Sequence, residues 1–339
     1  MIIAKAPGRA GIIGNPTDGY GGAMIACSIP HYATVILTPA ERLELVSGEE
    51  RVFIKWENDL QLQGDSFDLA RAVLKYFKAG DLKARVEMQS DIPRQAGLAG
   101  STALLSALMG AILKARGQEY FLHYFAEVNR IIELRYMKTH CGYQDAYMTT
   151  FGGLNYLDFR GKAYYRSLEE EVYATVERLE VEELPFILAH TGVKHNSGSY
   201  HRPIRERWLE GEKEVIEAYE EITELALKGK RALLDGNWGE LGRLMNENHR
   251  IQDNLNYAGD ENNRLIKAAL AGGALGAKLA GAGGGGTIIA LTLDKEKTIK
   301  ALLEAGAERI LELDPAARGI TVEEIANPEV TEMSSLNNN

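Results

Sequence analysis

Glycine clusters constrain the fold of this chain more than any other feature of its sequence. Glycine makes up roughly 10% of the chain, 35 of 339 residues, against a background of about 7%. Thirteen of these glycines fall within residues 7–22, 93–103 and 278–287. Because glycine permits positive φ angles and a close backbone approach, the clusters predict loops that lie against another backbone or a ligand.

Composition and charge exclude several classes of protein. The hydrophobic fraction of 45% is typical of a globular chain, and 48 acidic against 38 basic residues argue against nucleic-acid binding. Cys27 and Cys141 form no CxxC pair, which excludes a disulfide framework and favours a reducing cytoplasm. No apolar run approaches about 18 residues, and the first residues do not form a signal peptide, so we expect a cytoplasmic protein without a membrane segment.

The hydrophobic pattern mixes short strands with longer helices and predicts an α+β fold. We expect strands at residues 2–5, 33–37, 43–46, 52–56, 84–89, 154–159, 186–190 and 287–291. We expect helices at residues 67–77, 101–115, 121–137, 204–226, 238–255, 262–270 and 295–305. Residues 1–180 and 181–330 are the expected domains, followed by a polar tail at 331–339.

The first cluster, residues 7–22, surrounds the polar side chains Arg9, Asn15, Asp18 and Tyr20. Aspartate and asparagine accept hydrogen bonds from hydroxyl groups, so this set predicts a sugar site. The alternative is a long turn with local hydrogen bonds from the Asx side chains.

The second cluster, residues 93–103, follows an expected strand and opens an expected helix. Free N–H groups at a helix N-terminus bind anions, and the hydroxyls of Ser101 and Thr102 can ligate Mg²⁺ or contact phosphate. The GK[ST] end of a Walker A loop is missing. The alternative is an ordinary Ser/Thr helix cap.

The third cluster, residues 278–287, contains glycines spaced like a dinucleotide fingerprint, but they lead into a strand and not into a helix. This context predicts a loop that closes over phosphates, with a flexible hairpin as the alternative.

Two acidic residues between the second and third clusters are candidates for chemistry. Asp145 stands where a short helix begins, and it could orient a substrate hydroxyl or only cap that helix. Glu133, on the preceding expected helix, is either a second Mg²⁺ ligand or a solvated helix acid.

Taken together and in order, these segments resemble the GHMP kinase superfamily from about residue 4 to residue 293. Residues 93–103 are similar to its phosphate loop PxxxGLGSSA, with Gly100 and Thr102 replacing the common serine pattern. Residues 142–145 resemble the block with the catalytic aspartate, and residues 278–286 the third, glycine-rich motif. Within the superfamily, residues 14–20 look like the GNPSD form of glucuronokinase-type enzymes, as do residues 93–101 and 197–211, and heptose-phosphate kinases carry a block similar to residues 142–145.

The resemblance implies phosphoryl transfer that depends on ATP and Mg²⁺. The implied fold is an N-terminal domain like domain 2 of ribosomal protein S5 and a ferredoxin-like C-terminal domain, with the active site between them. Asp145 and Arg9 are the implied catalytic residues. The implied ATP residues are Arg94, Gln95, Ala96, Gly97, Leu98, Ala99, Gly100, Ser101, Thr102, Gly283 and Gly284. The implied sugar residues are Asn15, Asp18, Tyr20, His195, Ser197 and His201, and the metal ligands Ser101 and Glu133.

The sequence therefore predicts a sugar kinase, with the anomeric C1 hydroxyl of D-glucuronate or a related sugar as acceptor. A basic cluster would hold the uronate carboxylate, or it is a solvated helix start: Lys194, His195, His201, Arg202 and Arg205. A heptose-phosphate or other sugar GHMP kinase, and a non-catalytic ligand-sensing protein of the same fold, are the alternatives. We expect a monomer or homodimer that binds a small sugar and ATP but no nucleic acid and no membrane.

Overall fold

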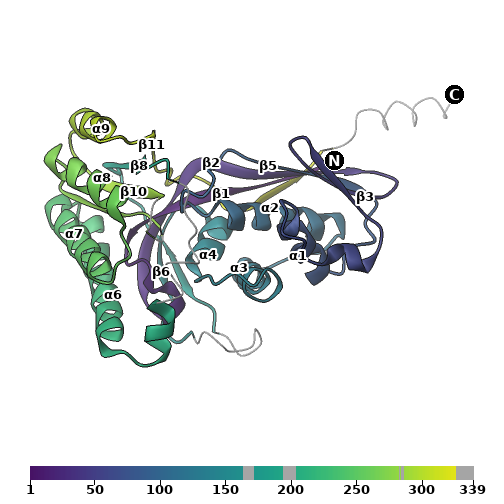
Figure 1. Cartoon of the computed structure of the whole chain (residues 1–339), viewed down its shortest axis with the longest axis horizontal. Helices are drawn as coiled ribbons and strands as arrows, with labels where there is room; N and C mark the ends of the chain where they lie inside the picture. Colours follow the sequence, from purple (N-terminus) through teal and green to yellow (C-terminus); the bar gives the residue numbers. More distant parts are fainter. Residues whose placement is uncertain (163–171, 194–203, 282, 284–285, 326–339) are drawn as a thin grey trace.

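Two sheets organise the chain in the computed structural model, which describes residues 1–162, 172–193, 204–281, 283 and 286–325 (Figure 1). The first sheet has the order β12-β1-β2-β5-β3-β4; β6 also pairs with β2, and β7 pairs with β6. Its strands are β1 (Ile2–Ile13), β2 (Ala23–Pro39), β3 (Leu43–Ser47), β4 (Glu50–Ile54), β5 (Ala84–Ser90), β6 (Leu154–Asp158), β7 (Thr175–Arg178) and β12 (Thr321–Glu324). The second sheet has the order β11-β8-β10-β9. Its strands are β8 (Phe186–His190), β9 (Gly276–Leu279), β10 (Thr287–Leu291) and β11 (Arg309–Leu311).

In Figure 1, α1 to α3 lie beside the first sheet and α7 to α9 beside the second, while α6 packs against α7 and β2. The first group is α1 (Asp68–Tyr76), α2 (Gly100–Ala115), α3 (Leu122–Ile131) and the π-helical turn η3 (Ile132–Tyr136) that follows it. Helix α4 (Gln144–Phe151) packs against α2 and α3. The second group is α6 (Lys213–Leu234), α7 (Trp238–Asn254), α8 (Asp260–Ala271) and α9 (Lys295–Glu304). Two 3₁₀ turns, η1 (Thr17–Tyr20) and η2 (Glu57–Leu60), and a short helical segment at 204–209 complete the described helices.

Separate hydrophobic cores support the two sheets. One core packs the first sheet against α1, α2 and α3, and another packs the second sheet against α8 and α9. A third cluster joins β1 and β2 to α6, α7, β8 and β10, so it lies where the two sheets meet. The buried seam between the sheets is thus built on the strand that carries the first glycine cluster.

Several expected elements differ from the structure. The strand expected at 33–37 belongs to the longer β2, and the helix expected at 121–137 is α3 followed by η3. The first strand does not end at Pro7 but continues to Ile13, paired with β2 through two register shifts. Small residues permit this, because a Cβ at Gly8 would lie 2.8 Å from the Leu98 carbonyl oxygen. The long helix expected over 204–226 is broken: helical residues 204–209 end before Gly211, whose φ is +78°, and α6 starts afterwards.

The predicted domain boundary lies between β7 and β8, which belong to different sheets. Strand β12, from the range 181–330, nevertheless returns to pair with β1 in the first sheet. The boundary therefore stays a prediction, and the tail at 331–339 lies outside the described residues. Within the described ranges, no helix combines the length and the apolar character needed to cross a membrane.

Gly8 provides a test of this packing. We expect Gly8→Ala to lower the free energy of unfolding by about 1–3 kcal/mol, because the new methyl group collides with the Leu98 carbonyl and the Ile29 side chain. The matched control is Gly239→Ala on the exposed part of α7, where only one atom lies near the new Cβ, at 3.9 Å. The control should be neutral or slightly stabilising. Equal stability of Gly8→Ala and the natural protein in urea unfolding would contradict the close contact.

Candidate active site

Arg9 joins the first and second glycine clusters to Asp145. Its side chain is only 6% exposed, its Nη1 donates to the Gly97 carbonyl at 2.7 Å, and its Nε donates to Asp145 Oδ1 at 2.7 Å. The backbone N–H of Arg9 also donates to the Leu98 carbonyl at 3.1 Å. Because charge-assisted bonds in a buried site are strong and directional, Arg9 fixes the position of the loop relative to the carboxylate.

Asp145 is the second residue of α4, and its side chain keeps 32% of its surface exposed. The helix is capped by a distant residue, since Asp18 Oδ2 accepts the backbone N–H groups of Tyr143 at 2.6 Å and Gln144 at 2.8 Å. A Cβ at Gly142 would lie 1.9 Å from that oxygen, so only glycine allows this approach. Asp145 therefore does not cap its helix, and its carboxylate is presented beside Arg9.

The second cluster has the geometry of an anion site. Helix α2 starts at Gly100 after Ala99, whose φ is +62°, and no side chain of the described residues caps its N-terminus. The alternative of an ordinary Ser/Thr cap is therefore excluded. The loop that precedes the helix also places Gln95 and Gly97 at positive φ. The first N–H groups of α2 follow this curled backbone, and uncapped N–H groups at a helix N-terminus are the donors that phosphate binding requires.

The third cluster connects β9 and β10 and lies against the phosphate loop. A Cβ at Gly281 would be 2.4 Å from the Gly97 carbonyl oxygen, and one at Gly286 would be 2.8 Å from that of Ala96. The hydrogen bond from Gly11 N–H to the Ala280 carbonyl, at 2.8 Å, ties the first cluster to the third. All three glycine clusters thus meet at one place, although the sequence separates them by as many as about 270 residues.

Asn15 differs from its predicted role in sugar binding. Its amide nitrogen donates to the carbonyls of Gly281 at 3.1 Å and Leu279 at 3.4 Å, and its Oδ1 accepts from Lys278 at 2.6 Å. The residue is 1% exposed. Protein contacts therefore occupy this side chain, and its role in the structure is to hold the third cluster. These long-range bonds also exclude a local Asx turn for Asn15.

Glu133 lies in the π-helical turn η3 and is buried, so it is not a solvated helix acid. The hydroxyl of Thr102, predicted as a phosphate contact, donates to Glu133 Oε1 at 2.7 Å. Burial raises the pKa of Glu133 to about 7; the Thr102 hydrogen bond lowers it and the negative charge of Asp145 raises it. Within the described ranges, no group of three or more His, Cys, Asp or Glu residues could form a metal site by itself.

Tyr20 and Asp18 line a small pocket in front of α4. The Tyr20 ring packs against Trp208 and Tyr219, with centroid distances of 5.1 and 4.7 Å. The pocket is lined by Pro16, Asp18, Gly19, Tyr20, His140, Cys141, Gly142 and Arg205. His140 is not predictable as a site residue from the sequence, because an isolated histidine in a loop carries no signal of its own. Ser101 is exposed at the start of α2.

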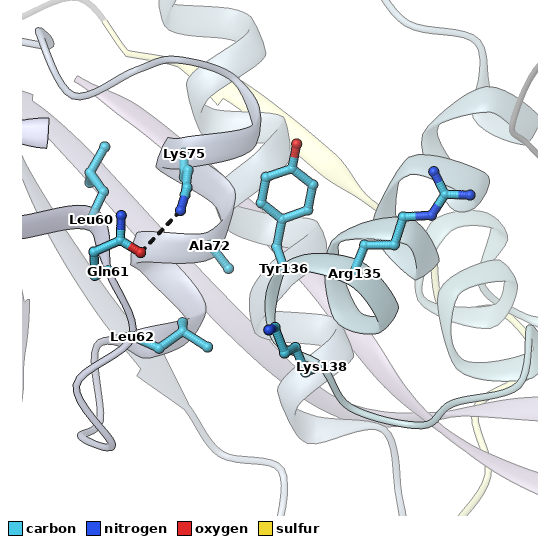
Figure 2. Close-up of a pocket in the computed structure, with 8 residues that line it drawn as sticks. All are labelled: Leu60, Gln61, Leu62, Ala72, Lys75, Arg135, Tyr136 and Lys138. Atoms are coloured by element: carbon cyan, nitrogen blue, oxygen red, sulfur yellow. Dashed lines mark hydrogen bonds between the residues drawn. The ribbon is translucent and has the colours of Figure 1, made fainter. Parts of the chain in front are cut away.

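A second cavity, of about 440 Å³, lies between η2, α1 and η3, and no sequence motif marks it. In Figure 2, Leu60, Gln61 and Lys75 lie on one side of it and Tyr136 and Lys138 on the other, and Lys75 donates to Gln61 at 3.2 Å. Tyr136 follows Glu133 by one helical turn. The cavity is lined by Leu60, Gln61, Leu62, Ala72, Lys75, Arg135, Tyr136 and Lys138.

Several predicted site residues lie outside the described part of the chain: Lys194, His195, Ser197, His201, Arg202 and Gly284. Their roles stay predictions. Gly283 is described, with φ of +86°, in the third cluster, and Arg94 and Leu98 lie in the loop before α2.

Two family models match parts of this chain. The family model of the GHMP kinases N terminal domain matches residues 68–153, and that of GHMP kinases C terminal matches residues 230–310. The chain belongs to the GHMP kinase superfamily. It is therefore a kinase with the two-domain fold of that superfamily, as the motifs predicted, and GHMP kinases use ATP.

The similar proteins are named as kinases of different substrates. Glucuronokinase 1 of Arabidopsis thaliana is 28% identical over 320 residues, covering 87% of this chain and 86% of that protein. Mevalonate kinase of Pyrococcus furiosus is 25% identical over 346 residues, covering 96% and 99%. The crystal structure of a D-glycero-D-manno-heptose 1-phosphate kinase from Bacteriodes thetaiotaomicron superposes with a TM-score of 0.73, at 21% identity, over 96% and 100% of the two chains. That structural likeness confirms the fold.

The pKa of Glu133 predicts a specific pH dependence of stability. The pKa is raised from 4.5 to about 7 on folding, so the protonated form stabilises the fold. This contribution is fully present below pH 4.5 and is lost as the pH rises through about 7. We expect Glu133→Gln, which stays neutral, to remove up to about 3 kcal/mol of that pH dependence.

The measurement is urea unfolding between about pH 5 and pH 8 without divalent metal. The stability of the variant relative to the natural protein should increase with pH. A constant difference would show that Glu133 titrates normally.

Proposed function

We propose that this kinase transfers the γ-phosphoryl group of ATP to a hydroxyl of a small sugar acid, with the anomeric C1 hydroxyl of D-glucuronate as the first candidate. The observation that carries the proposal is the contact of Arg9 with both Asp145 and the Gly97 carbonyl. It brings a carboxylate that can bind an acceptor hydroxyl next to a loop that can bind phosphates. Phosphoryl transfer requires this positioning and charge neutralisation more than covalent chemistry by the protein.

In this proposal the nucleotide binds across the second and third glycine clusters and the cavity of Figure 2. The phosphates bind the backbone of residues 94–102 and Gly283 at the N-terminus of α2. The base occupies the cavity that Tyr136 and Ala72 line, where an aromatic ring and apolar atoms can contact its faces. Lys75, Arg135 and Lys138 add positive charge to this cavity in a protein whose net charge is −10. ATP carries about four negative charges, so such local cations are needed for binding.

Magnesium fits the oxygen ligands at the start of α2. The buried carboxylate of Glu133 has a raised pKa because of burial and the charge of Asp145, and a cation there would offset both effects. The Ser101 hydroxyl and Glu133 would hold the ion, since Mg²⁺ prefers oxygen ligands. When bound, Mg²⁺ neutralises charge on the β- and γ-phosphates.

The acceptor is proposed to bind in the pocket between η1 and the loop before α4. Arg9 occupies Asp145 Oδ1, and within the described residues no hydrogen bond to Oδ2 is found, so Oδ2 is available to the acceptor hydroxyl. Asp145 then orients this hydroxyl and accepts its proton as the phosphoryl group arrives. Arg205 lines the same pocket and provides positive charge for a carboxylate on the acceptor.

The similarity to glucuronokinase 1 over most of both chains supports a uronate acceptor. The heptose kinase structure and the mevalonate kinase relative make a heptose phosphate or another hydroxylated acid the second choice. A non-catalytic ligand sensor is disfavoured, because both the aspartate and the phosphate loop are retained.

The acceptor is tested by measuring ADP release with Mg-ATP and a panel of D-glucuronate, D-galacturonate, D-galactose, a heptose phosphate and mevalonate. We expect turnover of D-glucuronate, with a product whose phosphorus couples to the anomeric proton in NMR. Turnover restricted to neutral sugars would overturn the sugar-acid proposal, and turnover of mevalonate alone would replace it.

The role of Asp145 is tested by Asp145→Asn. We expect kcat to fall roughly 10²–10⁴-fold, because an amide cannot accept the proton, while the affinity for Mg-ATP changes little. Asp235→Asn is the matched control, because Asp235 is exposed after α6 and pairs only with Arg231 among the described ion pairs. Full activity of Asp145→Asn would refute the assignment.

A further inference from the structure

Lys278 is a buried lysine in β9 for which the proposed function gives no direct role. The residue has no exposed surface, and its Nζ donates to Asn15 Oδ1 and to the Leu279 carbonyl, both at 2.6 Å. No carboxylate in the described part of the chain forms an ion pair with it. Burial without a counter-ion costs several kcal/mol, so an apolar side chain would serve packing better.

The contacts of Lys278 lead directly to the phosphate loop. Asn15, which accepts from Lys278, donates through its amide to the Gly281 carbonyl at 3.1 Å. Gly281 packs so closely on Gly97 that a Cβ there would lie 2.4 Å from the Gly97 carbonyl oxygen. The same carbonyl accepts the hydrogen bond of Arg9. A continuous series of contacts thus joins Lys278 Nζ to the proposed phosphate site.

The position of Asn15 is itself fixed by α7. Gln252 Nε2 donates to the Asn15 carbonyl at 3.1 Å, and Asn248 Oδ1 accepts from the preceding Gly14 N–H at 2.9 Å. Both glutamine and asparagine side chains are buried. Lys278 therefore donates to the side-chain amide of Asn15, whose backbone is held in place by α7. The orientation of that amide positions Gly281 through its hydrogen bond to the Gly281 carbonyl.

We propose that Lys278 is a positioning residue for the nucleotide: by orienting the Asn15 amide, it holds the third glycine cluster against the phosphate loop. The residue does not touch the ligand, because it is fully buried. This inference rests on the proposed nucleotide site at the glycine clusters. It goes beyond that proposal by assigning to a lysine and an asparagine of the seam a joint effect on ATP affinity.

The protonation behaviour of Lys278 is consistent with this role. Burial and then the positive charge of Arg9 lower the pKa of Lys278 well below its usual value. Its Nζ donates to two acceptors, Asn15 Oδ1 and the Leu279 carbonyl oxygen. The side chain therefore suits directed hydrogen bonding within the seam.

The test compares variants by the Kd of Mg-AMP-PNP, measured by calorimetry well below each melting temperature. Lys278→Met keeps the length of the side chain but removes the bond to Asn15. Asn15→Asp keeps an acceptor for Lys278 but removes both amide donors, including the bond to Gly281. We expect both variants to raise the Kd roughly tenfold, as expected for the loss of one strong hydrogen bond that orders the site.

Lys162→Met is the matched control for removing a buried lysine. Lys162 pairs with Glu127 at 2.8 Å, and both side chains are at most 2% exposed. This variant should melt at a lower temperature but bind Mg-AMP-PNP within about twofold of the natural protein. Near-UV circular dichroism confirms that each variant is folded at the temperature of the titration.

The outcomes separate the inference from the function on which it rests. A raised Kd in both seam variants but not in Lys162→Met supports the positioning role. Unchanged binding in folded Lys278→Met or Asn15→Asp overturns it, as does an equal rise in Lys162→Met, which would reflect general destabilisation. Absence of binding by the natural protein would overturn the proposed nucleotide site and, with it, this inference.

Discussion

The hydrogen bonds of Arg9 are the interaction on which the rest of the site depends. A single guanidinium, at the centre of β1, contacts a backbone carbonyl of the phosphate loop and the carboxylate of Asp145. Its planar fork holds several acceptors in fixed directions, which a lysine could not do. The Arg9 side chain, on a buried strand, therefore sets the distance between the proposed phosphate loop and the Asp145 carboxylate.

Close backbone packing among the glycine clusters is the second constraint on the site. The three glycine clusters approach one another so closely that a methyl group at Gly8, Gly281 or Gly286 would collide with a carbonyl of residues 96–98. These contacts leave no room for side chains, so the ligand would meet main-chain N–H groups. In a chain with a net charge of −10, such local donors and a few placed cations must offset the overall field that repels ATP.

Much of this arrangement could be predicted because motif spacing and hydrophobic periodicity are local properties. The glycine clusters, Asp145 and most helices followed from the sequence, and so did the α+β class. The sequence could not show that Asp18 caps α4 across 125 residues, or that Asn15 faces Lys278. Those contacts exist only after the sheets meet. The break before α6 was missed because the apolar pattern continues past Gly211, whose positive φ ends the helix.

The most direct measurement is a crystal structure of the protein with Mg-AMP-PNP and D-glucuronate. The γ-phosphate should lie over residues 97–102, and the anomeric hydroxyl should lie within hydrogen-bond distance of Asp145 and in line with the γ-phosphorus. A nucleotide bound away from the three glycine clusters, or an acceptor hydroxyl out of reach of Asp145, would contradict the mechanism.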